Sequence, residues 1–169
     1  MMNGEINELK KENINLFNKI AKYYDFFIKS WFNRIQIKAI GIAGIKKGRI
    51  LDAGCGTGNF LSMLENKTNK KLKLYGVDIS KEMLKIARKK LKKTKLKLMQ
   101  AENLRFKKKF DFVFSFDAFH HFYNQNKAME NFYRVLKSNG KLIIVDISFG
   151  IFNKLFHLIE PGNNKMHDA

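Results

Sequence analysis

Residues 49–60, Arg-Ile-Leu-Asp-Ala-Gly-Cys-Gly-Thr-Gly-Asn-Phe, constrain the fold of this chain more than any other segment. A short apolar strand runs directly into a turn with glycines at positions 54, 56 and 58. Glycine lets the backbone turn sharply and approach a ligand more closely than a Cβ would allow. The residues that follow have helical spacing, so the amides of the turn lie at a helix N-terminus and favour an anionic group such as a carboxylate.

Two acidic residues accompany this turn. Asp52 precedes the first glycine, and Asp78 ends the next apolar run, residues 72–78. The glycine spacing is one residue tighter than the dinucleotide fingerprint, and an acid at this position suits an ammonium better than a pyrophosphate. A carboxylate at the carboxyl end of the neighbouring strand can accept both ribose hydroxyls of a nucleoside. The segment therefore predicts a nucleoside ligand that also carries an amino-acid group.

Helical periodicity from about Lys10 to Ile45 is followed by alternating strand and helix patterns, which are typical of an α/β fold. Trp31, Phe32 and Ile35 are the expected packing anchors of the first helix. We predict one domain, residues 1–169, with a helical cap at 1–46, a cofactor-binding core at 47–148 and a tail at 149–169. Strands are predicted at 49–53, 73–78, 96–100, 110–116 and 141–147, and helices at 58–67, 80–92 and 124–137.

Composition excludes several classes of protein. One cysteine, Cys55, cannot build a disulfide framework or a cysteine metal site, and the remote histidines His157 and His167 lack a partner at ligand spacing, so no metal is expected. The N-terminus lacks the pattern of a signal peptide, and the longest apolar stretch, residues 142–152, is interrupted by Asp146 and too short to span a bilayer. We therefore expect a cytoplasmic protein.

The net charge of +18 calls for a separate explanation. The densest basic run, residues 85–97, contains no acid, and such a run can attract RNA or an acidic lipid surface. Several of its lysines surround the end of a predicted helix, where cations interact favourably with the helix dipole. Because charge runs are usually solvated faces, we expect at most weak, nonspecific anion contact.

Five segments together resemble the class I S-adenosylmethionine-dependent methyltransferases, and within them the small-molecule branch that includes the ubiquinone/menaquinone biosynthesis methyltransferases. They read LDAGCGTGNF at 51–60, YGVDISKEMLKIAR at 75–88, AENLRF at 101–106, FDFVFSFDAFHHF at 110–122 and RVLKSNGKLIIVD at 134–146. The resemblance implies a Rossmann-like fold with a central, mostly parallel sheet and helices on both faces. It also implies S-adenosylmethionine as cofactor and methyl transfer to a small-molecule acceptor, such as a quinone, a lipid or another metabolite.

The resemblance assigns roles to individual residues. Ile79 and Met83 would cover the adenine, although helical spacing explains Met83 equally well as a core residue. Gln100 stands where the family usually has Asp or Asn; it keeps an acceptor oxygen but is longer and neutral. The full predicted cofactor-binding set is Asp52, Gly54, Gly56, Thr57, Gly58, Asp78, Ile79, Met83, Gln100, Ala101, Glu102, Ser115 and Asp117.

Proton chemistry near the fourth strand has only two candidate residues, His120 and His121. The family commonly carries such a pair without using it as a base, and a histidine beside an apolar strand is not by itself a base. We therefore favour a structural role for the pair over a catalytic one. The family's Asn/Asp-Pro-Pro-Tyr signature for nucleobase amines is absent after this strand, which argues against DNA or RNA amines as acceptors.

The end of the chain leads to a further expectation. The family sheet has the order 3-2-1-4-5-7-6, and residues 149–159 have helical spacing, so we predict that the last two strands are missing and that the strand at 141–147 has an open edge. An open apolar edge is a template for pairing, so self-association is expected there. Two alternative functions remain: a non-catalytic or incomplete S-adenosylmethionine-binding module, and a nucleic-acid-associated methyltransferase that uses the basic face.

Overall fold

The structure, a computed structural model, describes residues 2–67, 71–107, 109–147, 154–159 and 167–168. Its strands form a seven-stranded sheet in the order β3-β2-β1-β4-β5-β6-β7. The pairs from β3 to β5 are parallel, and β6 and β7 are antiparallel to their neighbours. The strands are β1 (Gly48–Ala53), β2 (Leu72–Asp78), β3 (Lys95–Leu98), β4 (Phe110–Phe116), β5 (Leu136–Ile147), β6 (Lys154–Ile159) and β7 (His167–Asp168).

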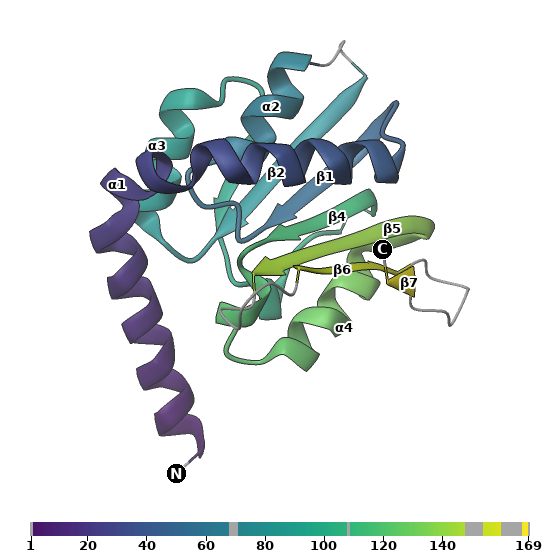
Figure 1. Cartoon of the computed structure of the whole chain (residues 1–169). Helices are drawn as coiled ribbons and strands as arrows, with labels where there is room; N and C mark the ends of the chain where they lie inside the picture. Colours follow the sequence, from purple (N-terminus) through teal and green to yellow (C-terminus); the bar gives the residue numbers. More distant parts are fainter. Residues whose placement is uncertain (1, 68–70, 108, 148–153, 160–166, 169) are drawn as a thin grey trace.

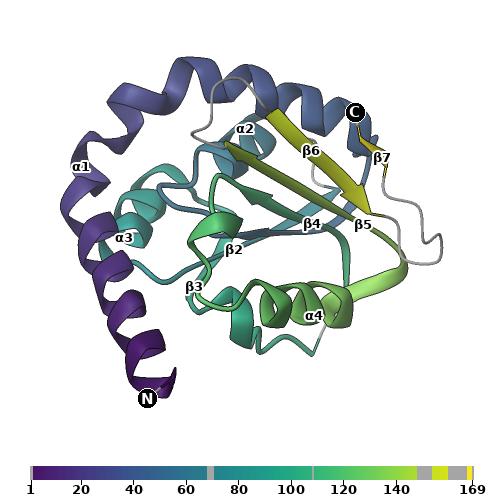
Figure 2. The same cartoon turned by 60° about the horizontal axis from the view of Figure 1, so that its bottom comes forward.

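Helices cover both faces of this sheet, as Figures 1 and 2 show. The long helix α1 curves around one face, which it shares with α2 and α3, while α4 lies on the other face. Two short 3-10 turns follow β3 and β4 and carry residues of the site described below. The helices are α1 (Met2–Ala43), α2 (Asn59–Lys67), α3 (Lys81–Lys90) and α4 (Gln125–Val135), and the 3-10 turns are η1 (Ala101–Asn103) and η2 (Phe119–His121). The predicted Rossmann-like α/β fold is confirmed.

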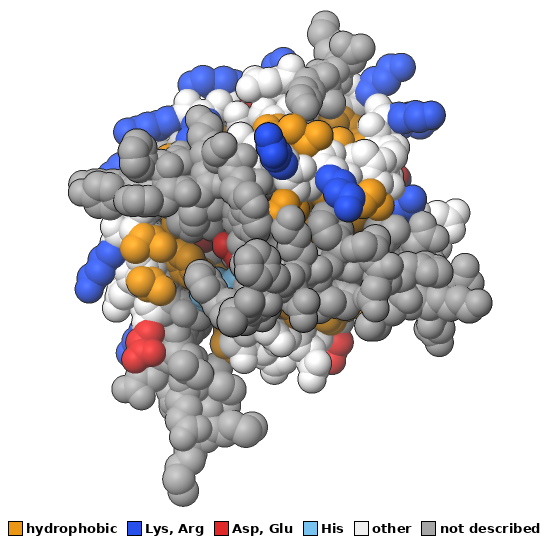
Figure 3. Space-filling model, viewed as in Figure 1, with side chains coloured by type: hydrophobic (Ala, Val, Ile, Leu, Met, Phe, Trp, Pro, Cys, Tyr) orange, Lys and Arg blue, Asp and Glu red, His pale blue; other side chains and the backbone are white. Residues whose placement is uncertain are grey.

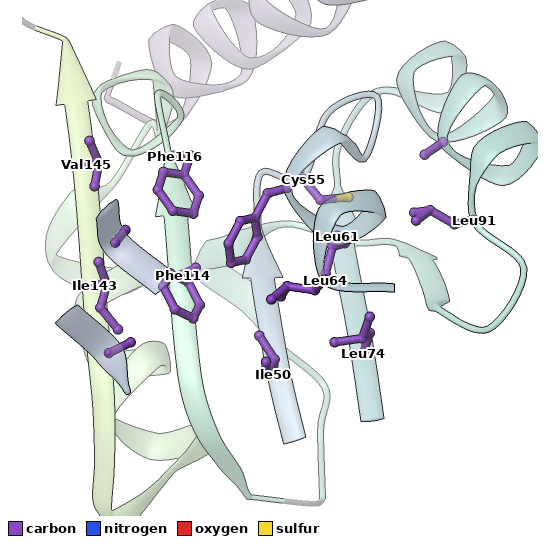
Figure 4. Close-up of a cluster of buried hydrophobic side chains, with 14 of the residues drawn as sticks. Ile50, Cys55, Leu61, Leu64, Leu74, Leu91, Phe114, Phe116, Ile143 and Val145 are labelled. Carbon is purple, nitrogen blue, oxygen red and sulfur yellow. The ribbon is translucent and has the colours of Figure 1, made fainter. Parts of the chain in front are cut away.

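Strand alternation separates the core into two layers, because successive side chains of a strand point to opposite faces. Phe114 packs with the α2 residues Phe60 and Leu64 on the face covered by α1, α2 and α3, as part of the cluster drawn in Figure 4. Val113, its neighbour in β4, packs instead in the cluster that contains Phe132 of α4. Ile35 of α1 is buried in the first cluster, as predicted. The side chains of Trp31 and Phe32 lie outside the described part of the structure.

The prediction that the last two strands are missing and that β5 has an open edge is wrong. Strand β6 pairs antiparallel with β5 from Leu142↔Ile159 to Ile147↔Lys154, and β7 extends the sheet by a further pairing. The chain at 154–159 therefore forms a strand and not part of a helix, because the unpaired edge of β5 offers a complete ladder of hydrogen bonds. The expected self-association through this edge loses its basis.

No helix in the described part of the chain is both long enough and apolar enough to cross a membrane.

Candidate functional site

The glycine turn between β1 and α2 adopts a backbone conformation that side chains rarely permit. Gly54, Gly56 and Gly58 have φ values of 78°, 51° and 79°. The amides of Gly54 and Cys55 donate hydrogen bonds to the carbonyl of Val77, at 2.9 and 3.0 Å, and thereby tie the turn to the end of β2. The turn is thus held against the carboxyl edge of the sheet, where ligands of open α/β folds bind.

Close packing adds a second requirement at two of these glycines. A Cβ at Gly54 would lie 2.4 Å from the Cβ of Ala118, and one at Gly58 would lie 2.7 Å from Cδ1 of Leu91. A Cβ at Gly56 would meet no atom within 4 Å, since this residue lines open space. The outer glycines therefore let the turn pack against its neighbours, and the middle one leaves room beside the cleft.

Asp78, at the end of β2, organises the turn from the other side. Its Oδ2 accepts a hydrogen bond from the amide of Gly56 at 2.8 Å, and its Oδ1 accepts one from the amide of Ser80 at 2.8 Å. Ser80 in turn caps α3, where its hydroxyl accepts from the amide of Met83 at 3.1 Å. Burial raises the pKa of Asp78, and its backbone hydrogen bonds partly oppose that rise.

Asp52 lies buried behind the same turn, with 2% of its surface exposed. Among the described residues nothing donates a hydrogen bond to its Oδ1. Burial raises the pKa of Asp52 well above its ordinary value, and the nearby charge of Asp78 raises it further. A buried carboxylate that is repelled by a second, partly buried one creates a site that favours a cation.

Removing the carboxyl charge of Asp52 and removing that of Asp111 should have opposite effects on the thermal stability of the protein. The folded-state pKa of Asp52 is raised, so its stabilising contribution is lost as pH rises from the unfolded pKa through the folded one. Asp52→Asn should therefore raise the thermal midpoint of the unliganded chain at neutral pH by a few degrees, since ~1 kcal/mol shifts a domain of this size by about 2–4 °C.

The matched control is Asp111→Asn. Asp111 is a half-buried acceptor for the amide of Arg49 and for Nζ of Lys137. Burial raises the pKa of Asp111, but these hydrogen bonds and the charges of Lys137 and Arg49 together lower it below its ordinary value. Its contribution is present above the unfolded pKa and is lost as pH falls through the folded one. Asp111→Asn should therefore lower the midpoint at neutral pH. Scanning calorimetry checks both variants, and a drop for Asp52→Asn would contradict the assignment of a repulsive carboxylate pair.

An open cleft lies in front of the glycine turn, and its mostly apolar lining with a few polar groups is typical of small-molecule sites. It is bounded by the turn, the ends of β2 and β4, the start of α3, the two 3-10 turns and one residue of α1. Figure 3 shows histidine and carboxylate atoms near apolar side chains on the face of the molecule seen in Figure 1. The lining residues are Phe17, Gly54, Gly56, Asp78, Ile79, Met83, Met99, Gln100, Ala101, Glu102, Phe116, Asp117, Ala118, His121, Phe122 and Tyr123.

The structure brings most of the predicted site residues into this cleft, while five lie outside its lining. Asp52, Thr57, Gly58 and Ser115 are buried beside or behind it, and His120 lies next to it. Ser115 differs from the prediction because strand alternation points its side chain away from Phe116, into the layer toward α4. Met83 is a buried core residue that also lines the cleft, and its contact with the adenine stays a prediction.

Several lining residues were not predicted from the sequence. Phe17 reaches the cleft from α1, and its ring meets that of His121 edge-on, with centroids 4.8 Å apart. Phe122 and Tyr123 follow the η2 turn and line the cleft as well. Only the dense aromatic content of residues 110–123 could have indicated Phe122 and Tyr123, because the sequence does not say which of these rings leave the core.

The wall of the cleft beside Gln100 is built from linked polar groups. The amide of Tyr123 donates to Oε1 of Glu102 at 3.0 Å, and the hydroxyl of Tyr123 lies 3.5 Å from Oε1 of Gln100. Asn131 of α4 donates to the carbonyl of Glu102 at 2.9 Å. Glu102, predicted to bind cofactor, thus also anchors the segment after η2 to the segment after β3.

The exit of β4 is strained. Asp117 has a φ of 49°, the only positive value among the described residues other than glycine, and its amide donates to the carbonyl of Val145 at 2.7 Å. Strained backbone of this kind clusters at functional sites, where neighbouring structure holds it in place. Here the sharp turn brings Asp117 and Ala118 to the mouth of the cleft and directs the η2 turn across it.

These features fit S-adenosylmethionine, whose amino-acid and nucleoside parts require different partners. Asp78 offers carboxylate oxygens suited to ribose hydroxyls, and the unpartnered oxygen of Asp52 suits an ammonium group. The open space beside Gly56 has room for the amino-acid part of the ligand. The fold and this site define a class I S-adenosylmethionine-dependent methyltransferase.

Comparisons with known proteins agree with this assignment to a class of methyltransferases. A family profile described as a methyltransferase domain matches residues 51–144, more than half of the chain. The chain is 39% identical over 157 residues to the uncharacterized protein MJ1252 of Methanocaldococcus jannaschii, covering 89% of this chain and 59% of that protein. It is 30% identical over 147 residues to the demethylmenaquinone methyltransferase of Thermotoga maritima, covering 82% and 62%. The chain belongs to the methyltransferase domain family.

Solved structures show the same fold. A SAM-dependent methyltransferase of Thermotoga maritima is 28% identical, with a TM-score of 0.66 over 80% of this chain and 62% of that one. The plantazolicin methyltransferase BpumL, solved with S-adenosylhomocysteine, shares the fold at a TM-score of 0.66 and 23% identity, over 86% of this chain and 62% of that one. The chain spans 59% and 62% of the length of the two curated relatives named above.

Proposed function

We propose that this chain transfers a methyl group from S-adenosylmethionine to an apolar small-molecule acceptor. The observation that carries the proposal is the buried carboxylate of Asp52 beside the partly buried Asp78, at a glycine turn that faces a largely apolar cleft. Two mutually repelling acids favour a cationic ligand and disfavour the pyrophosphate of a dinucleotide. S-adenosylmethionine supplies, when bound, a methyl group on a positively charged sulfur that leaves readily.

The protein's part in this reaction is to hold, align and exclude water. Asp78 would hold the ribose, and Ile79, Met83 and Ala101 provide apolar surface for the adenine. Holding the attacking atom and the methyl carbon about 3–3.5 Å apart supplies much of the catalysis that such a displacement needs. No further group is required for the sulfur to leave.

The acceptor end of the cleft is aromatic. Phe17, Phe116 and Phe122 line it together with His121. Flat apolar rings favour an acceptor that is itself apolar and aromatic. The resemblance to relatives named demethylmenaquinone methyltransferase and ubiquinone/menaquinone biosynthesis C-methyltransferase supports a ring of quinone type.

A thermal-shift screen tests the cofactor assignment. S-adenosylmethionine and S-adenosylhomocysteine should raise the midpoint of unfolding, since a ligand at a hundred times its Kd stabilises by about 2.7 kcal/mol. NAD should leave the midpoint unchanged. Stabilisation by NAD alone would overturn the proposal, whereas S-adenosylhomocysteine binding without methyl transfer to any aromatic acceptor would favour a non-catalytic binding module.

Gln100 allows a specific test of adenine recognition. Gln100→Leu should weaken S-adenosylhomocysteine binding, because it removes the acceptor oxygen of a side chain that lines the cleft. Gln100→Asp should preserve or tighten binding, because a shorter carboxylate accepts more strongly from the adenine amine. Calorimetric titration of the two variants decides, and equal affinity of Gln100→Leu and wild type would remove this side chain from adenine recognition.

A nucleic-acid-associated activity is the less favoured function. The basic run is partly built into the fold, because Glu65 accepts hydrogen bonds from the amides of Lys92 and Lys93 at 2.7 and 2.9 Å, and Lys97 lies over the ring of Phe106. On the face of the molecule that Figure 3 shows, Lys and Arg side chains are scattered rather than gathered in one patch.

Binding of RNA or of anionic lipid vesicles should therefore be weak, independent of sequence and lost as salt rises, since exposed charges are screened over about 8 Å at physiological ionic strength. Fluorescence anisotropy with labelled RNA oligonucleotides across a salt series measures this. Sequence-selective binding that survives high salt would overturn the small-molecule proposal.

A further inference from the structure

The two histidines of the η2 turn have different surroundings. His120 forms an ion pair with Asp146 of β5, with 3.2 Å between Nδ1 and Oδ1. His121 lines the cleft and contacts Phe17 of α1. The two imidazole rings are adjacent, with centroids 3.9 Å apart. The chain therefore places one histidine beside a carboxylate and the next one inside the proposed active site.

This placement separates the protonation of the two rings. The hydrogen bond to Asp146 raises the pKa of His120 despite partial burial, and the charges of Asp146 and Asp117 add to that rise. Burial lowers the pKa of His121, and the charge of His120 lowers it further, against a smaller opposing effect of Asp146. The other acids of the cleft are Asp78 and Glu102. The first ring therefore holds a proton more readily than its neighbour in the cleft.

Asp146 holds this arrangement to the sheet. Its Oδ1 also accepts a hydrogen bond from the amide of Ala118 at 3.1 Å, which fixes the start of the η2 turn. The carboxylate, the ion-paired imidazole and the turn therefore form one unit, and the second imidazole is positioned by packing against it.

We propose that His121 is the general base that accepts the acceptor's proton during methyl transfer, with His120 and Asp146 as positioning residues. The inference deepens the function proposed above and rests on it. It also names the acceptor class: a phenolic or enolic compound, whose attacking oxygen or ring carbon must lose a weakly acidic proton.

The step balances as follows. The acceptor's oxygen or carbon forms a bond to the methyl carbon, and the bond between that carbon and sulfur breaks with its electron pair remaining on sulfur. The acceptor's proton passes to a ring nitrogen of His121, which becomes an imidazolium. An amine acceptor would attack through its free electron pair and would lose its proton afterwards to water, so it needs no such base.

The same cluster has the composition of a cation site. One ligand atom each from Asp117, His120 and Asp146 lies within 4.8 Å of the others. The ion pair between His120 and Asp146 competes with metal binding, because a metal would require the neutral imidazole and an available carboxylate oxygen. Proton transfer is therefore the role that these contacts favour.

The first experiment measures protonation without turnover. NMR titration of the histidine ring carbons in the unliganded chain, assigned with His120→Asn and His121→Asn, should show His121 titrating below His120. Removing the neighbouring charge with His120→Asn should raise the midpoint of His121. If His121 titrates above His120, or if its midpoint does not move in His120→Asn, the proposal is overturned.

The second experiment compares two acceptor probes of the same shape, naphthol and naphthylamine. His121→Asn should lower kcat with naphthol by about 100-fold or more, the usual contribution of a general base, and change the rate with naphthylamine little. His120→Asn should shift the acidic limb of the naphthol profile to higher pH. S-adenosylhomocysteine affinity should stay the same in His121→Asn, and His167→Asn, a histidine change in β7, is the matched control.

The outcomes separate the two hypotheses. Three results would each overturn the role of His121. They are equal losses of rate with both probes in His121→Asn, an unshifted pH profile in His120→Asn, and a requirement for Mg²⁺, seen as loss of activity when EDTA is added. Failure of S-adenosylhomocysteine to bind the wild-type chain would overturn the proposed function itself. If the cofactor binds and neither probe is methylated, the NMR order of the two histidines still decides the proton assignment.

Discussion

Replacing Asp78 with alanine is expected to weaken S-adenosylhomocysteine binding about tenfold to more than a hundredfold. Hydrogen bonds to a charged group are worth about 1.5–3 kcal/mol, and each 1.4 kcal/mol is about tenfold in affinity. Asp78 would make such bonds to the ribose while its oxygens also hold the amides of Gly56 and Ser80. Isothermal titration calorimetry of wild type and variant measures the difference.

Two controls keep this result specific. Asp111→Ala removes a carboxylate from the first residues of β4, at the opposite end of the strand from the cleft, and should leave the affinity unchanged. Circular dichroism and a melting curve show whether Asp78→Ala remains folded, since it also removes the partner of two amides in the turn. A folded Asp78→Ala variant with wild-type affinity would exclude Asp78 from the cofactor site.

The sequence predicted the part of the fold that lies between β1 and β5, because each element there has its own local signal. The apolar run before Gly54 predicted β1, and the helix predicted at 80–92 contains α3, which Ser80 caps in the structure. The predicted strand boundaries at 110–116 coincide with β4. Periodicity and capping are local properties, so a single sequence can reveal them.

The prediction of a helical tail was wrong for a physical reason. Residues 154–159 read Lys-Leu-Phe-His-Leu-Ile, so they lack the strict alternation of a half-buried strand, and their apolar spacing fits a helix. Their strand conformation comes from pairing with β5, a contact between distant residues that overrides weak local preference. Local propensity alone could not show that the edge of β5 pairs with residues 154–159 of the same chain.

The site was predicted better on its cofactor side than on its acceptor side. Gly54, Gly56 and Asp78 follow from spacing, and the structure places all three in the lining of the cleft. Phe17 comes from α1, far away in sequence, and its contact with His121 depends on how that helix curves over the sheet. The opposite environments of the two histidines depend on Asp146 in another strand, so adjacent residues in the sequence gave no sign of them.

Gly54→Ala is the substitution expected to damage both stability and binding most directly. Gly54 has a φ of 78°, where an L side chain costs about 1–2 kcal/mol, and its new Cβ would lie 2.4 Å from the Cβ of Ala118. Overpacking of this kind usually adds about 1–3 kcal/mol. We expect a loss of about 2–5 kcal/mol in the free energy of unfolding and, because the turn must shift away from β4, a weaker affinity for S-adenosylhomocysteine.

Two further variants separate the causes of this loss. Gly41→Ala adds the same methyl group in α1, where no atom lies within 4 Å, and should stabilise the chain by up to about 1 kcal/mol through helix propensity. Adding Ala118→Gly to Gly54→Ala removes the clash but keeps the unfavourable φ, so the double variant should recover only the packing part of the loss. Urea unfolding of all four chains measures these differences. If Gly54→Ala unfolds like wild type, the close approach of the turn to the end of β4 is not what positions this site.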